Sequence, residues 1–379
     1  MTWTRDDAKL ERLRVLMDEE DLDALVVRAP DNVLYLTNFW GMKGYDAAVF
    51  PREGEPVLIT IEASEEDAAE TAWTDHVTLI RGYDPDDARP AFARTLDAAQ
   101  EAARAYARVG LELSLGTQAS DRMVGEPTTF TRGWFDAFPD AVDASSLLAR
   151  ARAVKTEQEI ERMRLANEIA AAAMEHVAAE LRPGMKESEA AALWLGFVHG
   201  EGTGWKGKVE LALGFSLVWS GPGIRTFTAT GHRPVQNHEP TLFEIWVCAD
   251  GYWCDHTKNV CPGELDPRYE ELLAQLLDVY NRAVDHCRPG ASLAELDRLV
   301  RDGLGPGQPS HPVAHGVGAR AHEPPYAHQA GGGVIEEGMV LAIEPGAYWD
   351  GGGGLRIEDN FLITADGPER LSSYPDDFR

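Results

Sequence analysis

A short segment in the C-terminal half places two acids where apolar strands usually carry none. The segment FEIWVCADGYWCDHTKNV, residues 243–260, has two apolar runs that meet at Asp250-Gly251. Asp-Gly is a strong signal for a two-residue turn, so the segment predicts a β-hairpin. In that register Trp246 lies opposite Asp255, and Glu244 lies on the same face, diagonal to Asp255. Two carboxylates that converge on one face repel each other unless a cation lies between them, which indicates a metal site.

Three later segments supply matching chemistry. SHPVAHGVGARAHEPP contains His315 and His322 among glycines that permit close approach of the backbone. LAIEPGAY places Glu344 at the end of an apolar run, and GLRIEDNFLIT places Glu358 inside a predicted strand. A single buried carboxylate is costly unless it is paired or metal-bound, and singly each acid is more typical of structure or surface. Together, an oxygen-rich set with one imidazole suits Mn²⁺, Co²⁺, Fe²⁺ or Zn²⁺.

The elements that must position these residues fall into two predicted domains. Over residues 1–150, helical and strand-like runs alternate, from LDALVV to the strand pair around AAVFPREGEPVLIT, which predicts an α/β domain with a mixed sheet. Over residues 151–379, a long helix stopped by Pro183-Gly184 is followed by a second helix, SEAAALWLGFV, and then by strands, a helix pair and a Gly-rich β region. That order predicts an α+β domain.

Composition excludes several classes of function. The formal net charge of −28 would repel the phosphates of nucleic acid. We expect no membrane partner because no apolar run approaches the length of a span, and the polar N-terminus favours a cytoplasmic location. The four cysteines form no C-x-x-C pair, which argues against a zinc knuckle and against a disulfide framework.

These motifs together carry a family resemblance. VKTEQEIERMR, HGVGARAHEPP, GMVLAIEPGAYW and GGLRIEDNFLIT resemble the pita-bread metallopeptidases, which include Xaa-Pro aminopeptidases, prolidases and the non-peptidase creatinases. LDALVVRAPDNVLYLTNFWG resembles the creatinase-type N-terminal domain. The resemblance covers nearly the whole chain. It implies a creatinase-like α/β domain followed by a pita-bread catalytic domain, and a homodimer in which residues near NFWGMKGYD approach the partner's pocket.

The resemblance also implies roles for individual residues. The five dinuclear-metal ligands of the family fall on Glu244, Asp255, His315, Glu344 and Glu358, with Asp255 and Glu358 bridging the two ions. Glu344 is the expected general base. His322 is expected to contact substrate and to stabilise the oxyanion, and Arg356 matches an arginine that is used near a substrate carboxylate.

Three positions depart from the family pattern. Glu244 stands where the family normally has Asp, and Trp246 where it usually has Gly. Phe227 occupies the place of a family histidine, and the nearest imidazole, His232, comes five residues later. We therefore expect one tight ion and a weakened second site, and a small, apolar substrate pocket lined in part by Phe227 and Trp246.

The leading hypothesis is a metal-dependent hydrolase that cleaves a small peptide or amide, with substrates that carry proline after the scissile bond among the candidates, through a water activated by the cation. An alternative is a hydrolase of a non-peptide C–N bond, of the creatinase or ectoine-hydrolase type, which can dispense with metal. A third is a non-catalytic peptide-binding member of the same fold. The nearly complete ligand set favours the first.

Overall fold

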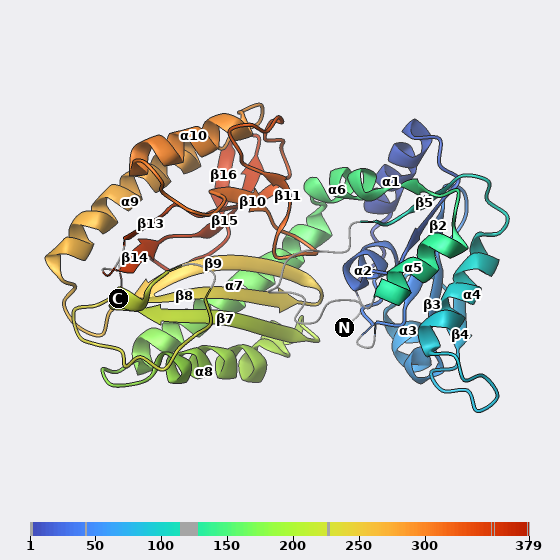
Figure 1. Ribbon diagram of the computed structural model, residues 1–379, viewed down its shortest axis with the longest axis horizontal. Helices are drawn as coiled ribbons and strands as arrows, with labels where there is room; N and C mark the ends of the chain where they lie inside the picture. The colour runs from blue at the N-terminus through green and yellow to red at the C-terminus, as the bar shows by residue number, and fades with distance from the viewer. Residues whose placement is uncertain are drawn as a thin grey trace. The chain divides into compact units, whose positions relative to one another are not determined.

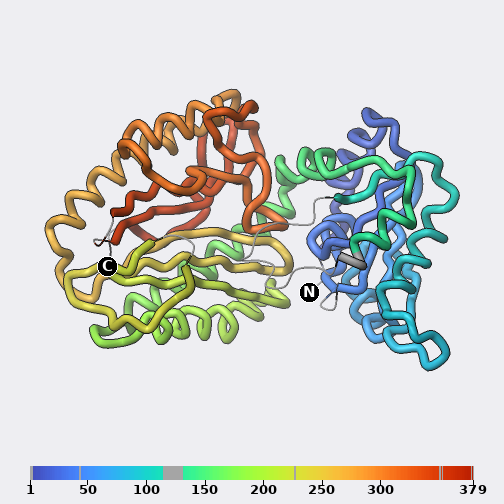
Figure 2. Tube along the Cα trace, in the orientation of Figure 1, coloured from blue at the N-terminus to red at the C-terminus, as the bar shows by residue number. Residues whose placement is uncertain are grey.

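The chain folds into two compact units, Met1–Arg152 and Ala153–Arg379. A computed structural model describes residues 3–41, 44–113, 128–225, 228–349, 351, 353–376 and 378. Phe227, together with Met42 and Lys43 of the NFWGMKGYD stretch, lies outside these described residues. Figures 1 and 2 trace the chain, and each unit is described by itself below.

The N-terminal unit contains a six-stranded mixed sheet of order β4-β3-β2-β1-β5-β6. Its strands are β1 (Ala24–Val27), β2 (Ala47–Pro51), β3 (Val57–Ile61), β4 (Val77–Ile80), β5 (Val109–Leu111) and β6 (Val142–Asp143). The pairs β1–β2 and β2–β3 are antiparallel, whereas β3–β4, β1–β5 and β5–β6 are parallel. The strand pair predicted around AAVFPREGEPVLIT is therefore confirmed.

Helices cover both faces of this sheet (Figure 1). They are α1 (Asp7–Glu19), α2 (Pro30–Thr37), α3 (Glu65–Thr71), α4 (Ala91–Ala103), α5 (Thr128–Ala137) and α6 (Ser145–Ala153). In β1, Leu25 and Val27 pack into the core formed with α1, α2 and α6, while Ala24 and Val26 pack toward α4 and α5. Because both faces are buried, the strand is apolar at every position rather than at alternate ones.

The C-terminal unit is built on two main sheets. One has the order β7-β8-β9 and the other β11-β10-β12-β15-β16, while β13 and β14 form a separate pair. The strands are β7 (Ala212–Ser220), β8 (Thr241–Ala249), β9 (Tyr252–Val260), β10 (Ala314–Gly316), β11 (Glu323–Tyr326), β12 (Val340–Ile343), β13 (Gly346–Trp349), β14 (Gly353–Arg356), β15 (Asp359–Thr364) and β16 (Gly367–Arg370). All pairings within these sheets are antiparallel.

Two helix pairs flank the sheets (Figure 1). They are α7 (Glu157–Glu180) with α8 (Glu187–Phe197), which contact β7, β8 and β9, and α9 (Pro267–His286) with α10 (Leu293–Leu304), which lie by the C-terminal strands. Helix α7 starts at a capping box in which the Thr156 hydroxyl accepts from the Glu159 backbone and the Glu159 carboxylate accepts from the Thr156 backbone. It ends before Pro183-Gly184, as predicted.

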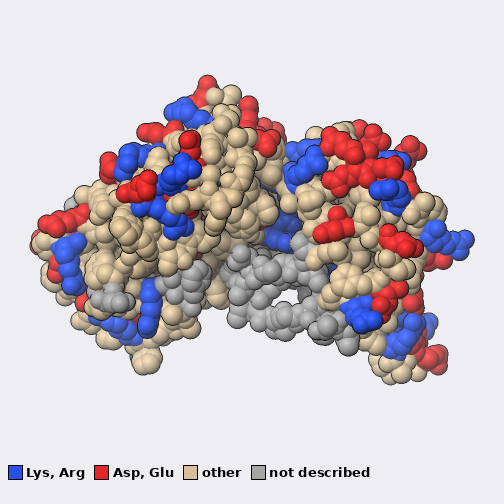
Figure 3. Space-filling view, turned by 45° about the horizontal axis from the view of Figure 1, so that its top comes forward, with Lys and Arg blue, Asp and Glu red and all other residues tan. Residues whose placement is uncertain are grey.

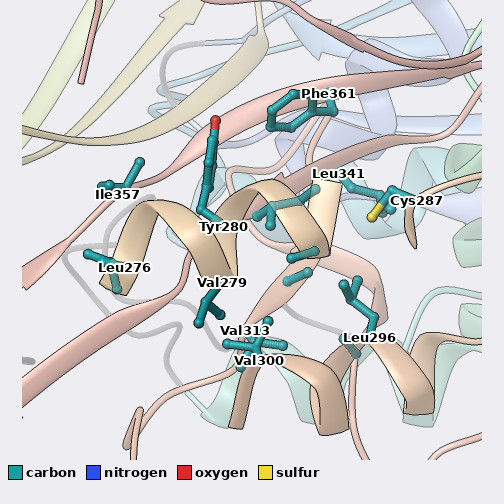
Figure 4. Packing of buried hydrophobic residues seen from close by; sticks show 14 of the residues in the cluster. Leu276, Val279, Tyr280, Cys287, Leu296, Val300, Val313, Leu341, Ile357 and Phe361 are labelled. Carbon is teal, nitrogen blue, oxygen red and sulfur yellow. The ribbon is translucent and has the colours of Figure 1, made fainter. Parts of the chain in front are cut away.

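Helices α9 and α10 hold the C-terminal strands through an apolar core (Figure 4). Leu276 and Val279 of α9 pack with Leu296 of α10 and with Leu341 of β12. Ile357 also enters this core, with 1% of its surface exposed. Its two neighbours along an extended chain, Arg356 and Glu358, are thereby directed away from this core.

Charged side chains of both signs occur on the displayed face of the molecule. Figure 3 shows Asp and Glu distributed over the displayed face, with Lys and Arg interspersed among them. The excess of acids over bases in the sequence is therefore not confined to one patch of that face. Among the described residues, no helix is both long enough and apolar enough to cross a membrane.

Candidate metal centre

The predicted hairpin supplies two of the candidate ligands. Strands β8 and β9 pair antiparallel around Asp250 and Gly251, whose positive φ angles of 46° and 86° are those of a tight primed turn. This turn fixes the predicted register, with Trp246 opposite Asp255. Glu244 pairs with Thr257, so Glu244 and Asp255 are diagonal neighbours on one face.

The second sheet supplies the other three candidates. His315 lies in the short strand β10, and Glu344 directly follows β12, at the Pro-Gly break that the sequence indicates. Glu358 lies just before β15, where it forms an isolated antiparallel bridge with Thr257 of β9. The centre therefore sits where the two sheets meet.

The side chain of Asn360 fastens the two sheets together at this point. Its amide oxygen accepts from the Asp255 backbone N–H at 3.0 Å, and its amide nitrogen donates to the Asp255 carbonyl at 2.8 Å. One side chain thus provides the hydrogen bonds that a neighbouring strand would provide. This arrangement fixes the backbone of Asp255 and the direction of its carboxylate.

All five predicted ligands converge. Three groups have ligand atoms that lie within 4.8 Å of one another: Asp255, His315 and His322; His315, Glu344 and Glu358; and Glu244, Asp255 and Glu358. His315 Nε2 lies 3.6 Å from Asp255 Oδ2, 3.6 Å from Glu344 Oε1 and 3.8 Å from Glu358 Oε1. These spacings leave room for an ion between the imidazole and the carboxylates.

The chemistry of four of these residues fits a divalent cation. Within the described part of the chain, Nε2 of His315 and both carboxylate oxygens of Asp255 are buried without a hydrogen-bond partner of normal geometry. Burial, together with the carboxylates of Glu358 and Glu344, raises the pKa of Asp255 well above its ordinary value, and the Trp246 indole opposes this shift. Burial also raises the pKa of Glu344, while His311 opposes the rise. A bound cation would stabilise the ionised forms of these buried acids.

Glu358 is already stabilised as an anion. Although burial opposes the shift, the neighbouring His315 and the charge of Arg356 lower the pKa of Glu358 to about 2. The hydroxyl of Thr257 also donates to Glu358 Oε2 at 2.7 Å. Glu358 is thus ionised and oriented without any ion.

Glu344 begins a chain of buried polar contacts that no sequence pattern indicated. Nδ1 of His311 lies 3.1 Å from Glu344 Oε2, and Nε2 of His311 lies 3.0 Å from the Tyr348 hydroxyl. Burial lowers the pKa of His311, but the charge and hydrogen bonding of Glu344, together with the Pro312 carbonyl and Glu358, outweigh burial, and the net shift is upward. His311 stands four residues before His315 in SHPVAH, yet neither spacing nor periodicity distinguishes it from a loop histidine.

Arg356 closes the opposite side of the centre. Its guanidinium forms an ion pair with Glu244, its Nε donates to Thr257 Oγ1 at 2.6 Å, and its Nη1 lies 3.4 Å from the Tyr348 hydroxyl. Burial lowers the pKa of Arg356 to about 10, with Glu358 opposing, so the group stays protonated at neutral pH. Glu244 is therefore paired with a positively charged side chain, whereas the carboxylate of Asp255 is not.

His322 and Trp246 lie next to each other beside Asp255. His322 Nε2 lies 3.3 Å from Asp255 Oδ2, and the His322 and His315 ring centroids are 4.3 Å apart. Burial and the neighbouring His315 lower the pKa of His322 to about 3, so the ring is neutral at pH 7. The Trp246 ring centroid lies 6.3 Å from that of His322 and 5.3 Å from that of Phe215. The structure therefore brings Trp246 to the metal-facing side, as the hairpin register predicts, whereas Phe227 lies outside the described residues.

Comparison with known proteins places this centre in a family. The chain matches Metallopeptidase family M24 over residues 161–365 and the Creatinase/Prolidase N-terminal domain over residues 9–166. Since the first match spans more than half of the 379 residues, the chain belongs to metallopeptidase family M24. The predicted family, the two-domain fold class with its pita-bread C-terminal domain, and the metallopeptidase type of hydrolase are confirmed.

Individual relatives match along nearly their whole length. The Xaa-Pro dipeptidase of Lactobacillus delbrueckii subsp. lactis is 27% identical over 381 residues, covering 94% of this chain and 95% of the relative. The Xaa-Pro dipeptidase of Pyrococcus furiosus is 26% identical over 379 residues, covering 96% and 97%. The solved prolidase of Pyrococcus horikoshii OT3 superposes with a TM-score of 0.80 at 24% identity, covering 98% of this chain and 100% of that chain. At this identity, the structural likeness establishes the fold.

Proposed function

We propose that this chain hydrolyses the amide bond of a small peptide or related amide, with Xaa-Pro dipeptides as the first substrate class to test. The observation that carries the proposal is that Asp255, His315, Glu344 and Glu358 converge. Both carboxylate oxygens of Asp255 and Nε2 of His315 are buried there without a hydrogen-bond partner among the described residues. Several relatives that match along nearly the whole chain are Xaa-Pro dipeptidases. This combination supports amide hydrolysis over the creatinase-type and non-catalytic alternatives.

The four residues would hold one divalent ion, for which manganese, cobalt, iron and zinc are the candidates. When bound, such an ion supplies Lewis acidity, which lowers the pKa of water and polarises a carbonyl. In the proposal Glu344 accepts the proton of the attacking water and returns it to the leaving amine. His311, at 3.1 Å from Glu344, holds this carboxylate in position. His322 donates a hydrogen bond to the carbonyl oxygen as negative charge develops on it.

The pocket should be restrictive. Trp246 has only 4% of its surface exposed and packs against Phe215 beside the reactive residues. We therefore propose that standard Xaa-Pro dipeptides are turned over slowly, well below the roughly 10 s⁻¹ of a typical enzyme. A homodimer and a cytoplasmic location complete the proposal. Light scattering that shows a monomer at micromolar concentration would remove the dimer.

The proposal is tested by chelating the purified protein, reloading it with Mn²⁺, Co²⁺, Fe²⁺ or Zn²⁺ separately, and measuring hydrolysis of Xaa-Pro and Xaa-Ala dipeptides and of non-peptide amidines. Activity that disappears on chelation and returns with one of the four metals supports it. Hydrolysis of the amidine alone, unchanged by chelation, would show a creatinase-type reaction instead. A metal-binding protein that cleaves none of these substrates would contradict the proposed activity.

A further inference from the structure

His322 depends on a short strand for its position. It directly precedes β11, which lies at the end of its sheet and, among the described strands, pairs with β10 alone. The register of this pair is irregular beside His315. Pro324 and Pro325 fall in the irregular stretch, and proline has no backbone N–H to donate to a neighbouring strand. The strand pairing therefore gives residues 322–325 limited support.

The side chain of Glu323 supplies a second attachment. Its Oε1 lies 2.9 Å from Nζ of Lys155, and both side chains are buried, with exposed fractions of 3% and 1%. Nζ of Lys155 also donates to the Ala153 carbonyl at 3.3 Å. Because water is excluded from this ion pair, its attraction is stronger and its geometry better defined than those of a pair on the surface.

The backbone of Lys155 is fixed as well. Its N–H donates to the Gly338 carbonyl at 2.8 Å, shortly before β12. The preceding residue, Val154, forms an isolated bridge with Met339. Strand β12 in turn pairs with β10, the strand that carries His315. Lys155 therefore has a fixed place relative to the strand that supplies the nitrogen ligand.

Two glycines allow this ion pair to pack closely. A Cβ atom at Gly318 would overlap Glu323 Oε1 and would lie 3.0 Å from Lys155 Cε. A Cβ atom at Gly316 would lie 2.6 Å from the carbonyl oxygen of Pro324 and 2.8 Å from that of Glu323. The pair thus occupies a tight space, in which the carboxylate of Glu323 has few alternative positions.

Fixing Glu323 also restricts the residue before it. Consecutive Cα atoms lie about 3.8 Å apart across a trans peptide, so His322 cannot shift far while Glu323 remains paired. From this place His322 Nε2 lies 3.3 Å from Asp255 Oδ2, and its ring centroid lies 4.3 Å from that of His315.

We propose that Lys155 is a positioning residue, which holds the His322 imidazole beside the centre through its ion pair with Glu323. The inference rests on the proposed function for what His322 does there, namely to donate a hydrogen bond to the substrate carbonyl. The placement of the ring itself requires neither substrate nor metal. Loss of the ion pair should therefore displace the ring even in metal-free protein.

The competing explanation is that the ion pair only stabilises the fold. Lys155→Met alone leaves a buried carboxylate unpaired, so it should destabilise the protein under either explanation. Lys155→Met/Glu323→Met removes both charges, and apolar replacement of a whole buried pair is often neutral for stability. If the pair only stabilises, this double variant should behave like the unmodified protein. If Lys155 positions His322, the double variant should fold but hold the ring elsewhere.

The first measurement follows the His322 ring by NMR in metal-free protein whose histidines are isotope-labelled at Cε1. The signal that is absent from His322→Gln identifies His322. Because the two rings lie close together, the ring current of His315 should displace this signal from its position in urea-unfolded protein. In the double variant the signal should move toward the unfolded position.

The second measurement compares kcat and KM after reloading with Mn²⁺, for an Xaa-Pro dipeptide that the unmodified protein cleaves. The double variant should lose about 100-fold in kcat, the effect of a misplacement of about 1 Å, with KM and manganese content nearly unchanged. Arg152→Met/Asp31→Leu is the matched control, because it removes a buried ion pair of 2.6 Å in the N-terminal unit. It should change neither the His322 signal nor kcat.

The proposal is supported if the signal moves and kcat falls in a double variant whose melting temperature stays close to that of the unmodified protein. An unmoved signal or an unchanged kcat in the folded double variant would overturn it. If the double variant does not fold, Glu323→Gln and Glu323→Met provide the comparison. Gln keeps an oxygen that accepts from Lys155 and should leave the signal in place, whereas Met should move it. Equal signals in these two variants would also overturn the proposal.

These outcomes are separate from those that test the proposed function. If the unmodified protein hydrolyses no peptide but the signal moves as expected, Lys155 does place His322 and the peptidase activity is refuted. If the unmodified protein hydrolyses peptides and the signal does not move, the role of Lys155 alone is refuted.

Discussion

The two faces of β9 both carry dense clusters of buried charge, but the clusters are satisfied differently. Asp255 and Thr257 face the candidate centre, where both oxygens of Asp255 have no normal hydrogen-bond partner among the described residues. Lys258 faces the other way, with its ammonium 2.7 Å from Asp359 and 2.9 Å from Asp376. Strand alternation thus separates an incomplete acidic cluster from a compensated one over three residues.

Two aspartates show what this difference means. Asp255 and Asp359 are each 0% exposed. Burial and the acids Glu358 and Glu344 raise the pKa of Asp255, whereas for Asp359 the effect of burial is outweighed by Lys258, with help from His256 and Arg370, and the pKa falls well below its usual value. Burial alone therefore does not identify a binding site. The absence of a compensating cation does.

The largest expected effect comes from removing the imidazole on the incomplete face. His315→Ala should reduce bound metal to near zero and hydrolysis to background, because His315 is the nitrogen ligand among the carboxylates. Elemental analysis after dialysis, with a peptide-cleavage assay, measures both. The control is His256→Ala, a buried histidine on the other face of β9 bonded to Asn167. Unchanged metal content in His315→Ala would show that His315 is not a ligand.

The compensated face should respond in stability rather than in metal content. Lys258→Met leaves Asp359 and Asp376 without their shared ammonium, which should cost about 3–5 kcal/mol in the free energy of unfolding. Urea denaturation measures this loss. Lys208→Met, which breaks an exposed pair with Glu161, should change stability by about 1 kcal/mol or less. A small loss in Lys258→Met would mean that the cluster is not stabilising in this sense.

The compensated face should also affect how the free energy of unfolding changes at acidic pH. Since the folded-state pKa of Asp359 is lowered, its contribution is fully present above the unfolded value of about 3.9 and is lost as pH falls toward the folded value. This part of the stability should therefore be lost as the pH falls below about 4. Asp359→Asn should therefore flatten the decline of stability between about pH 4 and pH 2. An equally steep decline in the variant would assign acid sensitivity to other groups.

The smallest expected effect is on the orientation of Glu358. Thr257→Val keeps the shape of the side chain but removes the hydroxyl that donates to Glu358, so metal affinity should fall by about 10- to 100-fold. Competition with a fluorescent chelator measures the affinity. Thr241→Val, in the neighbouring strand and bonded to Ser220 rather than to a candidate ligand, is the matched control. Equal affinity in both variants would show that the hydroxyl does not orient Glu358.

Local patterns predicted much of the fold and part of the centre. The Asp250-Gly251 turn determined the register of β8 and β9, because a two-residue turn leaves one pairing, and this placed Glu244, Trp246 and Asp255 on one face. The apolar run before Glu344 likewise located the end of β12. These features depend on contacts between residues close in sequence.

Contacts between distant segments could not be obtained in this way. The pairing of Asn360 with the Asp255 backbone joins residues 105 positions apart, and the pair between Arg356 and Glu244 joins different sheets. His311 approaches Glu344 only after β10 and β12 have paired. The periodicity of a single segment does not predict contacts between distant segments. The family resemblance identified Arg356 but not its contact with Glu244.

Because the candidate ligands lie where the two sheets meet, a bound ion would also affect the stability of the fold. Its candidate ligands come from β9, β10 and the segments that follow β12 and β14, so a bound ion ties together stretches of chain that would otherwise separate on unfolding. Mass action then makes folding depend on free metal, with a gain of about 2.7 kcal/mol when its concentration is 100 times the dissociation constant. The melting temperature of the protein should therefore rise with the logarithm of metal concentration, and heat resistance would become a measure of metal supply.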